Sequence, residues 1–374
     1  NLIRLVCNPA ITGFTLPKLL WSRENEPEIW DQTTTVLLPK DYVRLRLSGD
    51  KATDVADASG TLLFDVQKRN WSDEIFDRLG LNRSLVPKVF ESIDVTGTIN
   101  KHAAAETGLI EGTPIVAGAG DNAAGAVGMG IVAAGNASAT IGTSGVFFVT
   151  TDQPKFDLKG RIHTLCHAVP DRWHMTGVTL SAGFSLRWFR ENFGAGKSFE
   201  ELGESAEAIA VCSEGLFWLP YLMGERTPHL DAHARAAFIG LTATHTNAHA
   251  VRAVMEGVAF SLRDCLSIFR ELDLPIDKVR LGGGGAKSPI WRKIQADVYA
   301  ATVETIAAEE GAAFGAALLA GVGTGGWKTV DEACETSIRI SSTLEPESTS
   351  TAVYDRAFQT YQKIYPALKR VFQD

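Results

Sequence analysis

The sequence predicts an α/β protein built from two domains. Its 374 residues exceed what one hydrophobic core usually supports, and 45% of them are apolar, enough to bury two cores. From residue 114 onward, glycine-bounded β-rich runs are followed by helical patterns with a further strand between them, the order typical of an α/β domain.

Residues 1 to about 115 read as amphipathic helices joined by loops. The segment PKLLWSRENEPEIW places Leu19, Leu20 and Trp30 at helical spacings. The segment WSDEIFDRLGL begins with Ser72, a residue type that caps helices. This part of the chain therefore predicts helices that bury one face each.

The pattern from residue 114 onward predicts strands first and then helices. The strand-like runs are TPIVAGAG, ASATIGTSGVFFVTT, RIHTLCHAV and RWHMTGVTL, and the helical pattern AHAVRAVMEGVAFSLRDCLSIFRELDL follows them. A strand, KVRLGG, and a helix, PIWRKIQADVYAA, come next. From Val353, a final helix carries apolar residues on one face and should dock on a core; they are Tyr354, Ala357, Tyr361, Ile364, Tyr365 and Leu368.

Composition limits the classes of partner that the protein can have and indicates the cellular compartment in which it works. The formal net charge is −8 and the sequence has no basic run, which argues against a nucleic-acid or membrane-surface partner. No apolar run reaches the roughly 18 residues of a membrane helix, and the start lacks the apolar stretch of a signal peptide. Five scattered cysteines without a C-x-x-C pair are typical of a reducing compartment, so we expect a cytoplasmic protein.

A single acid, Asp121, stands in the small-residue stretch GAGDNAAGAVGMG. The stretch follows a strand and fits G-x-G-x-x-A, so a nicotinamide oxidoreductase is one reading. No Asp or Glu occurs between Asp121 and Asp152 to hold a ribose, and Asp121 would repel the pyrophosphate. The structural alternative is a tight strand-to-helix turn in which Asp121 caps the helix.

Two further glycine-rich segments predict close approach to an anion or a ring. Gly142 to Gly145 form the tip of a predicted hairpin, where backbone N–H groups and hydroxyls can cradle phosphates or simply make a turn. Gly282 to Gly285 join a strand to a helix that Ser288 caps. Such a flat loop can lie against a purine or receive a phosphate at the helix start, although it does not match the Walker A pattern.

Other polar residues have mainly structural readings. His163 and His167 lie in a strand without the glutamate of a zinc motif, so we expect core histidines. Glu225 and Arg226 form either a surface ion pair or part of a loop that lines a cleft. Glu256, on a long helix, reads as a structural acid.

The three glycine-rich segments, in this order, resemble the FGGY carbohydrate kinases. NPAITGFTLPKLLW resembles the first family signature and AFIGLTATHTNAHAVRAVME the second, while LPYLMGERTPH, GDNAAGAVG and CHAVPDRWH resemble the members that act on xylulose. The likeness covers nearly the whole chain. Two residues depart from it: Ala250 replaces a larger aliphatic, and Pro289 replaces an Asn that many relatives place against the nucleotide.

The resemblance implies an actin-like fold with two ribonuclease-H-like domains around a cleft. It assigns 1–117 to the remainder of an N-terminal sugar-kinase domain and 118–374 to a C-terminal nucleotide-binding domain, whose last helix packs back on the first domain. It also implies ATP and Mg²⁺ as cofactors, D-xylulose as the sugar, and a product phosphorylated at the 5-position.

The resemblance also implies roles for individual residues. Asp121 becomes the general base that takes the proton of the attacking hydroxyl, which suits phosphoryl transfer because positioning and charge dominate that chemistry. Asn122 would orient a sugar hydroxyl. The expected nucleotide contacts are Gly142, Thr143, Gly240, Gly284, Gly285 and Ala286, and no protein ligand for the metal is assigned.

The family's opening strand and D-x-G-T hairpin do not appear before NPAITG. We therefore expect an incomplete first domain, little kinase activity from these residues alone, and a sheet edge able to pair with a second copy in a homodimer. Alternatives are another FGGY kinase acting on glycerol, ribulose or gluconate, and a sugar-binding module without catalysis.

Overall fold

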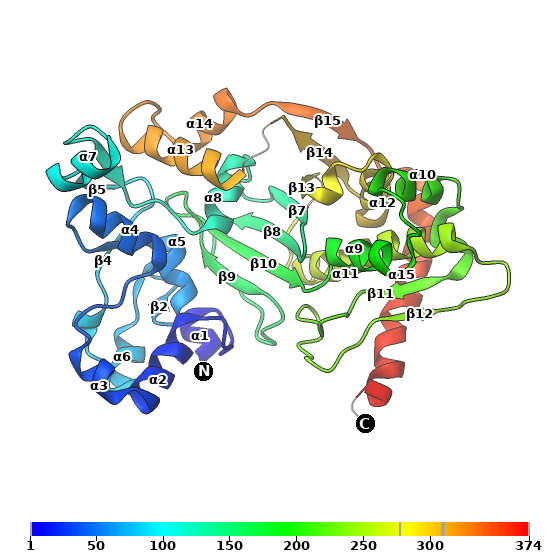
Figure 1. Cartoon of the computed structure of the whole chain (residues 1–374), viewed down its shortest axis with the longest axis horizontal. Coiled ribbons are helices and arrows are strands. Elements are labelled where there is room, and N and C mark those ends of the chain that lie inside the picture. The colour runs from blue at the N-terminus through cyan, green and yellow to red at the C-terminus, as the bar shows by residue number, and fades with distance from the viewer. Residues whose placement is uncertain (1, 277, 308–310, 373–374) are drawn as a thin grey trace. The chain divides into compact units, whose positions relative to one another are not determined.

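The computed structural model describes residues 2–276, 278–307 and 311–372 (Figure 1). The chain divides into two compact units, each assembled from three segments. The first unit holds Asn1–Ala134, Thr150–Met175 and Ala308–Arg339, and the second holds Gly135–Val149, Thr176–Ala307 and Ile340–Asp374. The expected division into 1–117 and 118–374 follows the order of the sequence, whereas each unit draws on distant parts of the chain.

Short helices and strands build the first unit around an apolar cluster. Phe64, Trp71 and Phe76 pack edge to face, with ring centroids 5.4 and 6.4 Å apart. Ser72 caps α6 as predicted, accepting a hydrogen bond from the N–H of Ile75. β1 pairs with β4 in parallel, and the pairs β2–β3 and β5–β6 are antiparallel.

The helices of this unit are α1 (Leu2–Val6), α2 (Thr15–Asn25), α3 (Pro27–Gln32), α4 (Pro39–Ser48), α5 (Val55–Ala58), α6 (Asp73–Leu79), α7 (Lys101–Thr107), α8 (Asp121–Gly128), α13 (Gly311–Gly323) and α14 (Val330–Ser337). Its two-stranded sheets use β1 (Ala52–Asp54), β2 (Phe64–Asp65), β3 (Asn70–Trp71), β4 (Lys88–Phe90), β5 (Val95–Thr98) and β6 (Pro114–Val116).

Close packing of α8 on α13 explains much of the small-residue stretch around Asp121. A Cβ on Gly128 would overlap the carbonyl oxygen of Gly311, and a Cβ on Gly315 would overlap that of Ala124. Glycine lets the two helix backbones touch here, because any side chain would separate them. The two helices lie side by side (Figure 1).

The large sheet has seven strands in the order β15-β14-β13-β7-β8-β10-β9. β13 pairs in parallel with β7 and β14, while β8 and β15 run antiparallel to β7 and β14. The mixed sheet and its helices confirm the α/β prediction. The strand bounds are β7 (Ala137–Ile141), β8 (Gly145–Thr151), β9 (His163–Cys166), β10 (Trp173–Thr179), β13 (Lys278–Gly283), β14 (Thr302–Ile306) and β15 (Ile340–Leu344).

Aromatic side chains join the helices of the second unit to its strands. Phe147 of β8 is fully buried between Phe269 and Tyr299, with ring centroids 5.9 and 5.6 Å away. Phe269 belongs to α11 and Tyr299 to α12. The helices of this unit are α9 (Gly183–Phe193), α10 (Phe199–Glu207), α11 (Asn247–Glu271), α12 (Pro289–Tyr299) and α15 (Ser348–Leu368), and a small sheet pairs β11 (Phe217–Leu219) with β12 (Ala237–Ile239).

The final helix, α15, docks on α11 through its tyrosine face. The rings of Tyr354 and Tyr361 lie 5.9 and 5.2 Å from that of Phe260. The Tyr354 hydroxyl donates to buried Glu256 at 2.7 Å, and Arg252 donates to the same carboxylate at 2.8 Å. The predicted docking face and the structural role of Glu256 are thus confirmed. The helix was expected against the first domain, but these partners lie in the second unit.

Two sequence expectations concern cysteines and membranes. All five cysteines carry free thiols. Within the described ranges, none of the helices has the length and apolar character needed to cross a membrane.

Candidate active site

Asp121 is the first residue of α8 and is exposed to solvent. The helix cap is Gly120, so the reading of Asp121 as an N-cap is wrong. Its Oδ1 accepts hydrogen bonds from the backbone N–H of Asn122 at 2.8 Å and from the Asn122 amide at 3.3 Å. A carboxylate at a helix start is favoured by the helix dipole, and both of these hydrogen bonds fall on the same oxygen of this exposed residue.

A network of charged side chains supports the loop that leads into Asp121. Arg44 of α4 donates to the carbonyl oxygen of Ala117 at 2.9 Å and to Asp41 at 2.8 Å. A Cβ on Gly120 would come within 3.1 Å of the Asp57 carboxylate, so the loop passes close to that acid. The residues before Asp121 are therefore held by α4 and α5.

Lys40 is the centre of this network. Its ammonium lies 2.5 Å from Asp54, 2.6 Å from Asp41 and 3.6 Å from Asp57. Burial lowers the pKa of Lys40, yet the three carboxylates raise it above its ordinary value. Burial raises the pKa of Asp57 to about 6, against the opposing charge of Lys40. Our sequence reasoning missed this network, although KD at 40 and 41 and the D-x-x-D spacing at 54 to 57 were visible.

The β7–β8 hairpin presents donors at its tip. Gly142, Thr143 and Ser144 are exposed, and Ile141 pairs with Gly145 as a hairpin requires. The carbonyl oxygens of Gly142 and Thr143 already accept hydrogen bonds from backbone N–H groups at the start of α9, at 2.8 to 3.2 Å. The Gly142 N–H also donates, to the Ser144 carbonyl oxygen at 3.0 Å, so the tip offers the N–H and hydroxyl of Thr143 to an anion.

Gly183 holds the hairpin tip in place and was missed by the sequence reasoning. Its N–H donates to the Gly142 carbonyl oxygen at 2.8 Å, and a Cβ there would overlap that same oxygen. The signal was a glycine three residues after the strand RWHMTGVTL, at the start of a helix.

The four-glycine loop lies beside the hairpin because β13 and β7 are neighbouring parallel strands. Gly283 pairs with Ile141, and a Cβ on Gly285 would come within 2.6 Å of the Ile141 side chain. Gly284 is exposed and meets nothing closer than 3.8 Å. Gly284 and half-buried Ala286 can thus face a ligand, while buried Gly285 provides the close packing. Ligands of α/β sheets bind at such carboxyl ends of parallel strands.

Gly240 has a structural explanation of its own. Its φ is +96°, and a Cβ there would overlap the carbonyl oxygen of Gly215. It follows β12, and no contact joins it to the hairpin or to the four-glycine loop among the described residues. Its nucleotide contact stays a prediction.

Burial decides the roles of the remaining polar residues that the sequence singled out. His167 is fully buried and its Nε2 lies 3.0 Å from the Ile131 carbonyl oxygen, while burial lowers its pKa to about 3. Across the described residues, no cluster of three metal-ligating side chains occurs. Glu225 is buried, so the surface ion pair with Arg226 is wrong, and Pro228 and His229 of the same loop line a cavity.

Comparison with known proteins decides the family. The N-terminal domain model of the FGGY family of carbohydrate kinases matches residues 2–128, and the C-terminal domain model matches residues 137–324. The chain belongs to the FGGY family of carbohydrate kinases. It is therefore a carbohydrate kinase with the actin-like fold of that family, and ATP is the phosphoryl donor that membership implies.

Individual relatives agree with the family. The xylulose kinase of Bacillus subtilis strain 168 is 41% identical over 369 residues, which span 99% of this chain and 74% of that protein. A ligand-bound xylulose kinase from Lactobacillus acidophilus superposes with a TM-score of 0.95 at 26% identity, covering 100% of this chain and 76% of the other. A gluconate kinase from the same organism superposes with a TM-score of 0.93 at 27% identity. The match covers 98% of this chain and 74% of the gluconate kinase.

Proposed function

We propose that this FGGY kinase transfers the γ-phosphoryl group of ATP to D-xylulose, forming D-xylulose 5-phosphate and ADP. The observation that carries the choice of sugar is the 41% identity to a xylulose kinase over nearly the whole chain. The fold cannot make this choice, because a gluconate kinase superposes almost as well as a xylulose kinase. A gluconate, ribulose or glycerol kinase is therefore the alternative.

Asp121 is the general base of the proposed reaction. A sugar hydroxyl attacks the γ-phosphorus, its proton passes to the Asp121 carboxylate, and the bond from that phosphorus to the β–γ bridging oxygen breaks to release ADP. The exposed position at the start of α8 supports this role, because the carboxylate is accessible and its backbone is held. Asn122, also exposed, orients a sugar hydroxyl.

The nucleotide contacts fall on the two neighbouring loops of the second unit. Thr143 donates to phosphate oxygens, and Gly142, whose N–H already donates to the Ser144 carbonyl oxygen, lets a phosphate approach the backbone because it has no side chain. Gly284 and Ala286 lie against the adenosine, and Gly285 keeps that loop close to β7. Mg²⁺, when bound, would neutralise phosphate charge, and it fits a site where nucleotide oxygens and water supply most ligands.

The substrate assignment is tested with the complete protein by following ADP release. D-xylulose, D-ribulose, gluconate and glycerol are compared at equal ATP and Mg²⁺. We expect the highest kcat/KM with D-xylulose. A higher value with gluconate would replace the proposed sugar while leaving the family untouched.

The base assignment is tested by Asp121→Asn. Because general-base catalysis contributes roughly 10²- to 10⁴-fold, kcat should fall by that amount while sugar and ATP still bind. Asp73→Asn is the matched control, since Asp73 is likewise the first residue of a helix and exposed. Equal turnover in the two variants would remove Asp121 from the mechanism.

A further inference from the structure

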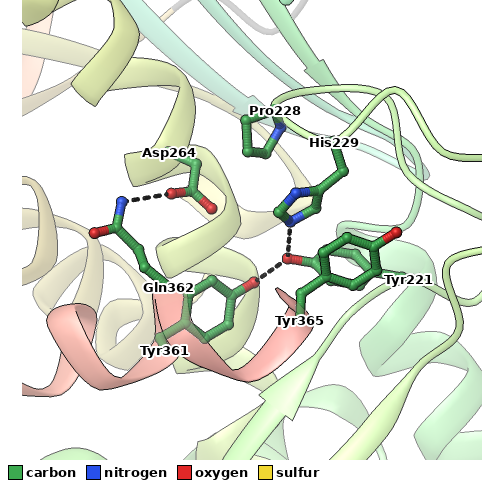
Figure 2. Close-up of a pocket in the computed structure, with 7 residues that line it drawn as sticks. All are labelled: Tyr221, Pro228, His229, Asp264, Tyr361, Gln362 and Tyr365. Carbon is green, nitrogen blue, oxygen red and sulfur yellow. Dashed lines mark hydrogen bonds between the residues drawn. The ribbon is translucent and has the colours of Figure 1, made fainter. Parts of the chain in front are cut away.

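A cavity of about 190 Å³ opens in the second unit between α11, α15 and the loop that follows β11 (Figure 2). Asp264 comes from α11, Tyr361 and Tyr365 come from α15, and Tyr221 and His229 come from the loop. Gln362, also on α15, is exposed at the rim. The cavity is far larger than a single water molecule needs.

Asp264 brings to this cavity a carboxylate oxygen that accepts no hydrogen bond from the described residues. The residue is 5% exposed, and its Oδ1 accepts one hydrogen bond, from the Gln362 amide at 3.1 Å. Figure 2 shows the second oxygen turned away from Gln362, toward the space beside His229 and Tyr361. No hydrogen bond from the described residues reaches that second oxygen. A buried carboxylate with one donor favours a further donor or a cation.

The three tyrosine hydroxyls of the wall are already bonded, to His229, to one another or to Asp231. The Tyr221 hydroxyl lies 3.1 Å from the Nε2 of His229 and 3.1 Å from the Tyr361 hydroxyl. The Tyr365 hydroxyl donates to Asp231 at 2.6 Å. A sugar or other polyol is best bound where many hydroxyl partners are free, and here the tyrosine hydroxyls are already bonded.

Aromatic rings supply most of the remaining surface. His229 stacks on Tyr365 with ring centroids 4.0 Å apart, and Tyr221 stands edge-on to both rings. Aromatic faces carry negative electrostatic potential and attract cations. The Asp264 carboxylate and the aromatic rings therefore both favour a cation as the ligand.

We propose that this cavity binds a small organic cation carrying N–H groups, with its charged nitrogen bonded to the second carboxylate oxygen of Asp264 and its carbon chain against the tyrosine rings. The site is separate from the sugar and nucleotide contacts of the proposed reaction and does not depend on which sugar the enzyme uses.

The charges around Asp264 permit this binding. Arg263 is engaged by Asp355 and lies over the Phe358 ring, and Lys369 pairs with Asp231. Burial lowers the pKa of His229 to about 4, so the imidazole is neutral at pH 7. Burial raises the pKa of Glu225 to about 8 and that of Asp264 to about 7. A bound cation would hold Asp264 in its ionised form.

The probe is n-butylammonium chloride, titrated into the complete protein by calorimetry without nucleotide, with 1-butanol and glycerol as neutral comparisons. We expect saturable binding of the ammonium, at least about tenfold tighter than 1-butanol, and no competition from glycerol. Affinity should fall about tenfold from pH 8 to pH 6, because Asp264 takes up a proton in that range. Equal binding of 1-butanol, or displacement by glycerol, would overturn the proposal.

Variants connect the binding to this cavity. Asp264→Asn should weaken n-butylammonium at least about tenfold, while Glu204→Gln, which removes an exposed charge from α10 of the same unit, should leave it unchanged. Gln362→Arg changes only an exposed rim residue and would supply its own cation to Asp264, so it should abolish binding. Gln362→Met is its neutral control and should retain binding. Binding to Gln362→Arg at the original affinity would contradict the proposal even if Asp264→Asn failed to fold.

Discussion

The glycines of the two units have different neighbours and therefore different roles. In the first unit, Gly128 and Gly315 let α8 and α13 touch, and the glycine before Asp121 lies against the charged Asp57. In the second unit, Gly283 packs on the backbone carbonyl of Ile141 and Gly285 on the apolar side chain of that residue, while Gly284 faces open space. The same composition therefore marks helix packing, loop support and a free binding surface. What a glycine does depends on which atoms stand where its side chain would be.

The largest expected effect separates two glycines of one helix. Gly128→Ala places a methyl group onto a backbone carbonyl that cannot move aside, so the free energy of unfolding should drop by about 3 kcal/mol. Gly125→Ala, one turn earlier and facing nothing within 4 Å, should instead gain roughly 0.5 to 1 kcal/mol. Urea unfolding followed by circular dichroism measures both. If both variants lose the same stability, helix packing does not explain this stretch.

The next comparison is between Gly285 and Gly284 of the four-glycine loop. It separates packing of the loop against β7 from contact with the nucleotide. Gly285→Ala meets the Ile141 side chain and should cost about 1 to 3 kcal/mol of unfolding free energy. Gly284→Ala has room and a negative φ, so stability should stay within about 0.5 kcal/mol. Its methyl group would nevertheless intrude on the nucleotide, raising the KM for ATP about tenfold. An unchanged KM would remove Gly284 from the proposed nucleotide contacts.

The smallest expected effect is the pH dependence of stability that Asp57, the acid beside the loop before Asp121, contributes. The pKa of Asp57 is about 6 in the folded protein against an ordinary 3.8, so the folded state binds a proton that the unfolded state releases between these values. The stability that Asp57 contributes is thus complete below pH 4 and is lost as the pH rises through 6. Asp57→Asn should be more stable than the original by about 1 to 2 kcal/mol above pH 6, with little difference at pH 4. Thermal unfolding at both pH values measures this, and a gap that does not change with pH would contradict it.

Local sequence patterns predicted the individual elements well. Ser72 and Ser288 cap the helices that they were expected to cap, and the run around residues 142 to 145 forms the expected hairpin. The small-residue stretch predicted a strand-to-helix turn, which β6 and α8 form. These signals are short-range, because a cap or a hairpin tip involves residues only a few positions apart.

The sequence by itself determined the α/β class, the order of the elements and, through the FGGY motifs, the kinase family with Asp121 and the glycine loops as its candidate site. Only the tertiary structure showed that Lys40 joins three carboxylates beside the Asp121 loop, that Gly183 holds the hairpin, and that Asp264 lines one cavity with Tyr221, His229 and Tyr365. These residues are far apart along the chain, and burial and electrostatic interactions depend on distance in space, which no local pattern encodes.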